Sequence, residues 1–122
     1  MMTGNTRLAA GLWAALLGLG CGGSSAPSER LVLAEAAIRG GIEINANVNP
    51  PRAALHLQLA QEQVEKAKRY ISDGMNERAE LALRQAQADA ELAIALARAE
   101  EMKQKATAAK IKVERLKAGR PL

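Results

Sequence analysis

The chain contains few side chains that could carry out chemistry. Its 122 residues include one cysteine, Cys21, and one histidine, His56. A catalytic triad or a histidine-based metal site would have to be built around that single imidazole. His56 stands between two leucines near the predicted start of a helix, so we expect it to be a surface or partly packed residue. The sequence therefore offers no nucleophile–base pair.

Closely spaced acids are the remaining candidates for a cation site. They occur at positions 62/65, 77/80 and 100/101, but basic residues stand beside nearly all of them. Hard cations prefer several converging oxygens, usually on a loop, so this pattern favours a solvated charged surface. We expect no enzyme activity, no metal, no cofactor and no small-molecule substrate.

Cys21 follows an uncharged apolar segment at residues 8–20, which is preceded by Arg7. A segment of this length is shorter than the roughly 20 residues that a membrane-spanning helix needs. The pattern predicts a signal peptide at residues 1–20. The glycines and serines after Cys21 predict a flexible tether that extends to Pro27.

The residues around this cysteine, Leu17-Gly18-Leu19-Gly20-Cys21, resemble the lipobox of bacterial lipoprotein precursors. The resemblance implies that Cys21 is lipidated, with palmitate or a similar chain, and anchors the protein to a membrane. Gly18 departs from the leucine that the family prefers there. Gly22, rather than aspartate, follows the cysteine, which in the enterobacterial sorting rule implies the outer membrane, facing the periplasm. Cleavage and secretion without a lipid is the alternative.

The rest of the chain predicts an all-α fold without strands. A helical domain at residues 28–118 is expected to comprise helices at about 28–39, 51–73 and 76–118, followed by a disordered end at 119–122. Ser28, Asn49 and Asn76 are the predicted N-caps, and Gly40-Gly41 and Asp73-Gly74 are the predicted stops. The short link near Gly74 predicts a long antiparallel hairpin of the second and third helices.

Apolar residues in the two long helices recur at spacings of three and four. In the second helix this seam is formed by Leu57, Ala60, Val64, Ala67 and Ile71. The third helix has two apolar stripes, one of them formed by Leu81, Ala88, Leu92, Ala95, Ala99, Met102, Ala106, Ala109, Val113 and Leu116. The other contains only alanines, Ala79, Ala82, Ala86, Ala90, Ala93 and Ala97. The pattern is coiled-coil-like, and the second helix is long enough to cover only about half of the third.

These helical segments, at residues 57–67, 77–82 and 86–93, also resemble a class of small alanine-rich domains of unknown function. Such domains are found in proteobacterial envelope lipoproteins, sometimes ahead of an OmpA-like domain; no OmpA-like segment is seen in this sequence. The turn around Gly74 and Ala79 is distantly similar to a tetratricopeptide hairpin, but there is no second repeat.

Two functional hypotheses follow. The uncovered stripe around Leu92, Ala95, Ala99 and Met102 predicts a structural or adaptor protein that binds another protein or itself. The alternative is an electrostatic contact to anionic lipid or cell-wall polymer, because residues 102–122 carry seven basic side chains and one acidic one. The basic residues on the helix are Lys103, Lys105, Lys110, Lys112, Arg115 and Lys117. Export makes nucleic acid an unexpected partner.

Overall fold

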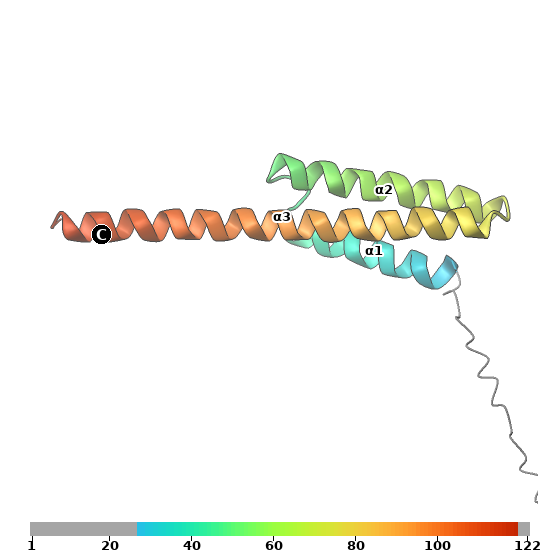
Figure 1. The fold of residues 1–122 in the computed structure, drawn as a ribbon, viewed down its shortest axis with the longest axis horizontal. Helices are drawn as coiled ribbons and strands as arrows, with labels where there is room; N and C mark the ends of the chain where they lie inside the picture. Colours follow the sequence, from blue (N-terminus) through green and yellow to red (C-terminus); the bar gives the residue numbers. More distant parts are fainter. Residues whose placement is uncertain (1–26, 120–122) are drawn as a thin grey trace, which may run out of the picture.

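A computed structural model describes residues 27–119 and shows three helices and, within that range, no strand. They are α1 (Pro27–Glu43), α2 (Pro51–Ser72) and α3 (Asn76–Lys117). Figure 1 shows α2 and α3 side by side and running in opposite directions, with α1 along the other side of α3. The all-α class predicted from the sequence is confirmed. The predicted signal peptide, Cys21 and residues 120–122 lie outside the described residues.

The first helix is longer than predicted, because it continues through Gly40 and Gly41 to Glu43. Gly41 is buried at the point where α1 meets both other helices: a Cβ added there would lie 2.7 Å from Cδ1 of Leu57. A Cβ at Gly40 would be 3.7 Å from Cδ1 of Ile94. The glycines were read as a helix stop, and this was wrong. The absence of a side chain at Gly41 lets α1 approach Leu57 closely.

The stop signal of α1 is Asn45, which has a φ of 59°. Its amide donates to the carbonyl of Ile42 at 2.9 Å, and the amide of Ala46 donates to the carbonyl of Gly41 at 2.9 Å. These two bonds form a Schellman motif, in which a residue in the left-handed region satisfies the last carbonyls of a helix. Asparagine tolerates this conformation better than most residues. The asparagine-rich connector therefore contains the helix end as well as the turn.

The turn between α2 and α3 has the same construction, with Gly74 at a φ of 72°. The amide of Gly74 donates to Ile71 at 3.0 Å and that of Met75 to Tyr70 at 2.8 Å, both at carbonyl oxygens. The predicted bounds of α2 and α3 agree to within one residue. The predicted N-caps differ: the cap positions are Pro50 and Met75, and neither makes a side-chain capping bond.

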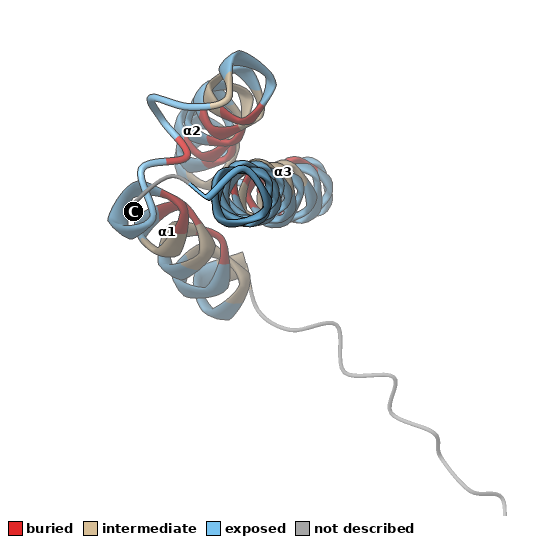
Figure 2. Ribbon diagram, turned by 90° about the vertical axis from the view of Figure 1, so that its left-hand side faces the viewer, coloured by how far each residue is buried: buried red, intermediate tan, exposed pale blue. Residues whose placement is uncertain are grey.

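The core is thin and made largely of alanine. The predicted seam of α2 is buried from Leu57 to Ala67, and Ile71 packs partly buried at its end. On α3 the alanine stripe is buried, together with Leu83, whereas the leucine-containing stripe is not. Leu57 and Leu83 are the largest fully buried side chains. Figure 2 shows the buried residues facing the space between the three helices.

The last part of α3 has no neighbouring helix. The helix contains 42 residues and α2 only 22, and every residue from 101 to 119 is exposed. In Figure 1 this end extends well beyond α1 and α2. The difference in helix length predicted from the sequence thus leads to a projecting arm at residues 102–117.

Candidate functional site

An exposed apolar seam along α3 is the main candidate surface. We call it the α3 seam and define it as Leu81, Ala88, Leu92, Ala95, Ala99, Met102, Ala106, Ala109, Val113 and Leu116. Every one of these residues is exposed. The large side chains are exposed to between 42% for Leu92 and 64% for Met102. The α3 seam therefore continues without a break from the packed part of the helix onto the projecting arm.

The α3 seam lies on the side of α3 that α1 and α2 leave uncovered. At 3.6 residues per turn, the buried alanine stripe and the α3 seam occupy largely opposite faces of the helix. The seam positions alternate at spacings of four and three. Position 85 also belongs to this series, but it is occupied by the polar residue Gln85. This is the heptad pattern with which one helix packs against another. The predicted partner residues Leu92, Ala95, Ala99 and Met102 lie at its centre.

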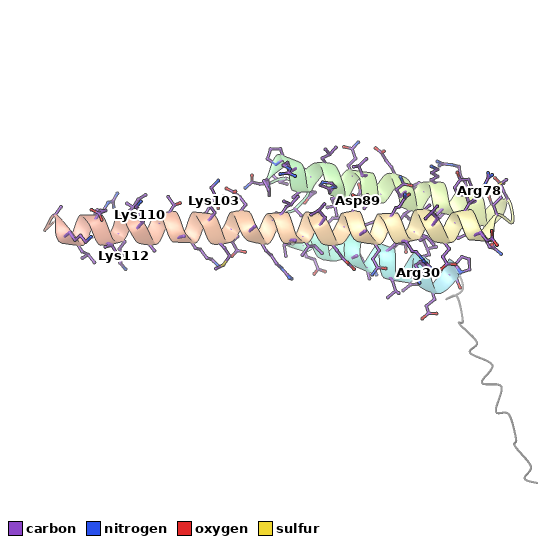
Figure 3. The ribbon with its side chains drawn as sticks, viewed as in Figure 1. Arg30, Arg78, Asp89, Lys103, Lys110 and Lys112 are labelled. Carbon is purple, nitrogen blue, oxygen red and sulfur yellow. The ribbon has the colours of Figure 1, made fainter. Side chains whose placement is uncertain are left out.

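Basic side chains border the α3 seam along the projecting arm. Lys103, Lys110 and Lys117 follow seam positions on one edge, and Lys105 and Lys112 precede seam positions on the other. In Figure 3, Lys103 and Lys110 extend from one side of the arm and Lys112 from the opposite side. All of the heptad positions that flank the seam on the arm are thus lysine.

These lysines differ in whether a carboxylate of the same chain lies close enough to neutralise their positive charge. Lys103 lies 3.6 Å from a Glu100 carboxylate oxygen, and Lys117 lies 3.3 Å from one of Glu114. Within the described range, no carboxylate lies within 4 Å of Lys110 or Lys112. The middle of the arm therefore carries the least compensated positive charge.

Lys105 makes the closest ion pair on the arm, 2.5 Å from Glu101. Its hydrogen bond and its charge lower the pKa of the Glu101 carboxyl from 4.5, with a small further contribution from Arg98. Both side chains are exposed, so the pair mainly supports the local helix.

Polar contacts join α2 to both of the other helices. Nδ1 of His56 and Oδ1 of Asp89 are 2.8 Å apart, joining α2 to α3 (Figure 3 shows Asp89 between them). Lys68 of α2 lies 3.1 Å from Glu35 of α1, and the hydrogen bonds that Lys68 donates to Glu65 and Glu35 raise its pKa. The sequence analysis treated His56 as a surface or partly packed residue and did not find its partner. The sequence did contain a signal for this contact. Asp89 is next to Ala90 of the alanine stripe and therefore lies at the border of the buried face of α3.

Potential metal-binding side chains are spread out along the described residues. No group of three or more histidine, cysteine, aspartate or glutamate side chains among residues 27–119 is placed to hold a metal ion. A hollow of about 410 Å³ lies where the α1–α2 connector meets α3, with Val48, Ala97 and Glu101 in its lining. It is open and lined by mixed polar and apolar groups. None of the helices in this part of the chain is long and apolar enough to cross a membrane.

Comparison with protein-family models, with curated proteins and with solved structures gives no match to this chain. The resemblance to lipoproteins with an alanine-rich domain of unknown function therefore stays a prediction based on the residues. The geometry of α3 and the charges beside its seam carry the functional interpretation.

Proposed function

We propose that the chain is a membrane-tethered, non-catalytic lipoprotein of the bacterial envelope that works as a structural or adaptor protein. Its α2–α3 pair acts as a coiled-coil-like, distantly tetratricopeptide-like hairpin, and the α3 seam binds a helix of another protein or of a second copy. A lipid on Cys21 holds it on the outer membrane, facing the periplasm.

The observation that carries this proposal is the exposure of a heptad seam over about 35 residues of one helix, apolar at every position except Gln85. An apolar stripe of this length covers roughly 50 Å of helix at 1.5 Å per residue. Contiguous apolar patches on soluble surfaces usually mark interaction sites. A helix placed in such a seam buries residues of the heptad pattern from both chains, as in helix-in-groove recognition.

Crosslinking in cells tests the proposal. A photo-reactive amino acid placed at Leu92 or Met102 is expected to give a discrete crosslinked product in the membrane fraction. The same group at Gln61, an exposed residue on α2, is the matched control and should give none. The absence of products from both seam positions would count against an adaptor role.

The membrane anchor needs a separate test. Mass analysis of the mature protein is expected to show acylated Cys21 as its first residue, and Cys21→Ser should move the protein out of the membrane fraction. Identical behaviour of the two proteins would refute the anchor.

A second candidate function is an electrostatic contact between the arm and anionic lipid or cell-wall polymer. Lys110 and Lys112 favour it, because no carboxylate among residues 27–119 lies within 4 Å of either. Binding to anionic vesicles should then fall with added salt and with replacement of these lysines by glutamine. Vesicle binding that ignores both changes would contradict it.

A further inference from the structure

The charges that flank the α3 seam are mixed on the packed half of the helix and all basic on the arm. On the arm the flanking positions are Lys103, Lys110 and Lys117 on one edge and Lys105 and Lys112 on the other. On the part of α3 that packs against α2, one of these edges has Asp89 as its charged residue and the other has Arg84, Glu91 and Arg98. A partner that matches the seam must therefore present acids to the arm, and the other half of α3 has two acids at such positions, Asp89 and Glu91.

A parallel pairing of two copies is unfavourable. In a parallel coiled coil, a residue on one edge meets the residue five positions later on the opposite edge of the partner helix. Lys105 would then face Lys110 of the partner, and Lys112 would face its Lys117. These like charges repel each other. The arm has one acid to compensate them, Glu114, which lies 3.3 Å from Lys117 of its own chain.

An antiparallel pairing removes this conflict. When Leu92 of one copy lies opposite Ala109 of the other, Ala88 lies opposite Val113 and Ala99 opposite Met102. In that register Lys112 approaches Glu91 of the second copy, and Lys110 approaches its Asp89. One kind of like-charge contact is left, between Arg98 and Lys105, and it occurs twice in the symmetric pair. Lys110 and Lys112, which have no carboxylate within 4 Å among the described residues of their own chain, thereby obtain one from the second chain.

We therefore propose that a second copy of this chain occupies the α3 seam, with the two α3 helices antiparallel and the arm of each lying against the packed half of the other. The inference rests on the proposed function, since it names the partner of the same surface. The antiparallel pair requires no displacement of α1 or α2, because the α3 seam lies on the face that these helices leave open.

The contact is expected to be modest in strength. Five of the ten seam residues are alanines, which let two helix backbones approach closely but bury little area each. Leu92, Met102 and Val113 provide most of the apolar contribution. Tethering both copies to one membrane would raise their effective concentration and favour the pair.

Sedimentation and disulfide crosslinking of the full chain carrying Cys21→Ser test the orientation. An equimolar mixture of Leu92→Cys and Ala109→Cys chains is expected to form a disulfide-linked heterodimer under mild oxidation. Each variant alone should stay largely uncrosslinked, because an antiparallel pair in this register holds its identical positions far apart. A disulfide between two Leu92→Cys chains would indicate a parallel pair and overturn the proposal.

A charge reversal tests the register. Glu91→Lys should raise the dimer dissociation constant about tenfold, because two attractive contacts per dimer become repulsive. Adding Lys112→Glu in the same chain should restore it. Both sites are exposed, so the helical circular dichroism signal of each variant should match that of the parent. Failure of the second change to rescue the first would refute this register.

The outcome also separates this inference from the proposed function. A monomer in sedimentation together with crosslinks from Leu92 to a different protein in cells would overturn self-association and leave the adaptor function standing. A monomer with no crosslinks from the α3 seam would reject both.

Discussion

His56 of α2 and Asp89 of α3 form a direct contact, with Nδ1 and Oδ1 2.8 Å apart. Their side chains are 23% and 27% exposed, so the contact is partly shielded from water. A carboxylate accepts hydrogen bonds only, which makes the imidazole nitrogen the donor. Most of the core consists of alanines that could slide past one another with little steric resistance. A directional bond between the two helices therefore helps to fix their relative register.

Removing either partner should destabilise the fold. We expect His56→Ala and Asp89→Ala each to lower the free energy of unfolding by about 1 kcal/mol, the usual contribution of a partly buried hydrogen bond. A double-mutant cycle measured by urea unfolding should give a coupling energy of about 0.5–1.5 kcal/mol. Additive effects would show that the contact contributes nothing in solution.

The sequence was sufficient to predict the helices but not all of the contacts between them. Spacings of three and four located α2 and its buried seam, because the core repeats with the period of the helix. The same spacings could not show which of the two apolar stripes of α3 is buried. Packing selected the alanine stripe, since α1 and α2 both approach α3 closely on that side, and it left the larger side chains of the seam outside.

Gly40 and Gly41 show a second limit of local patterns. A glycine pair is typical of a helix end, but it also suits a close contact between two helices, and only the position of Leu57 distinguishes these cases. The residue that ends α1, Asn45, was read as part of a turn-rich connector. Leu83 was missed as well, although it lies four residues after Ala79 and three before Ala86 and so continues the buried stripe.

The contact at Gly41 gives a prediction with an internal control. Gly41→Ala should destabilise the protein by about 1–2 kcal/mol, because the new methyl group would overlap the buried Leu57 side chain. Gly40→Ala should be neutral or stabilising by up to about 1 kcal/mol, since its methyl group meets only an ordinary contact and alanine favours the helix. Thermal unfolding of the two variants tests this. Equal effects would contradict the close approach of α1.

The ion pair between Glu101 and Lys105 predicts a pH effect on the arm. The folded-state pKa of Glu101 is lowered, so the stabilisation is present above the reference value of 4.5 and is lost as the pH falls through the folded pKa. NMR titration of the Glu101 carboxyl should give a pKa below 4.5, and Lys105→Gln should raise it. A titration unaffected by that substitution would mean that the pair does not persist in solution.

Two leucines separated by one residue should respond very differently to truncation. Leu83 is fully buried and Leu81 is 61% exposed. Leu83→Ala should cost about 2–4 kcal/mol of unfolding free energy, because it opens a cavity in a core with few other large side chains. Leu81→Ala should stay within about 0.5 kcal/mol of the parent, as expected for an exposed helix position. Urea unfolding measures both. If the two costs were reversed, the leucine-containing seam would be the buried face of α3, and it could not be the docking surface.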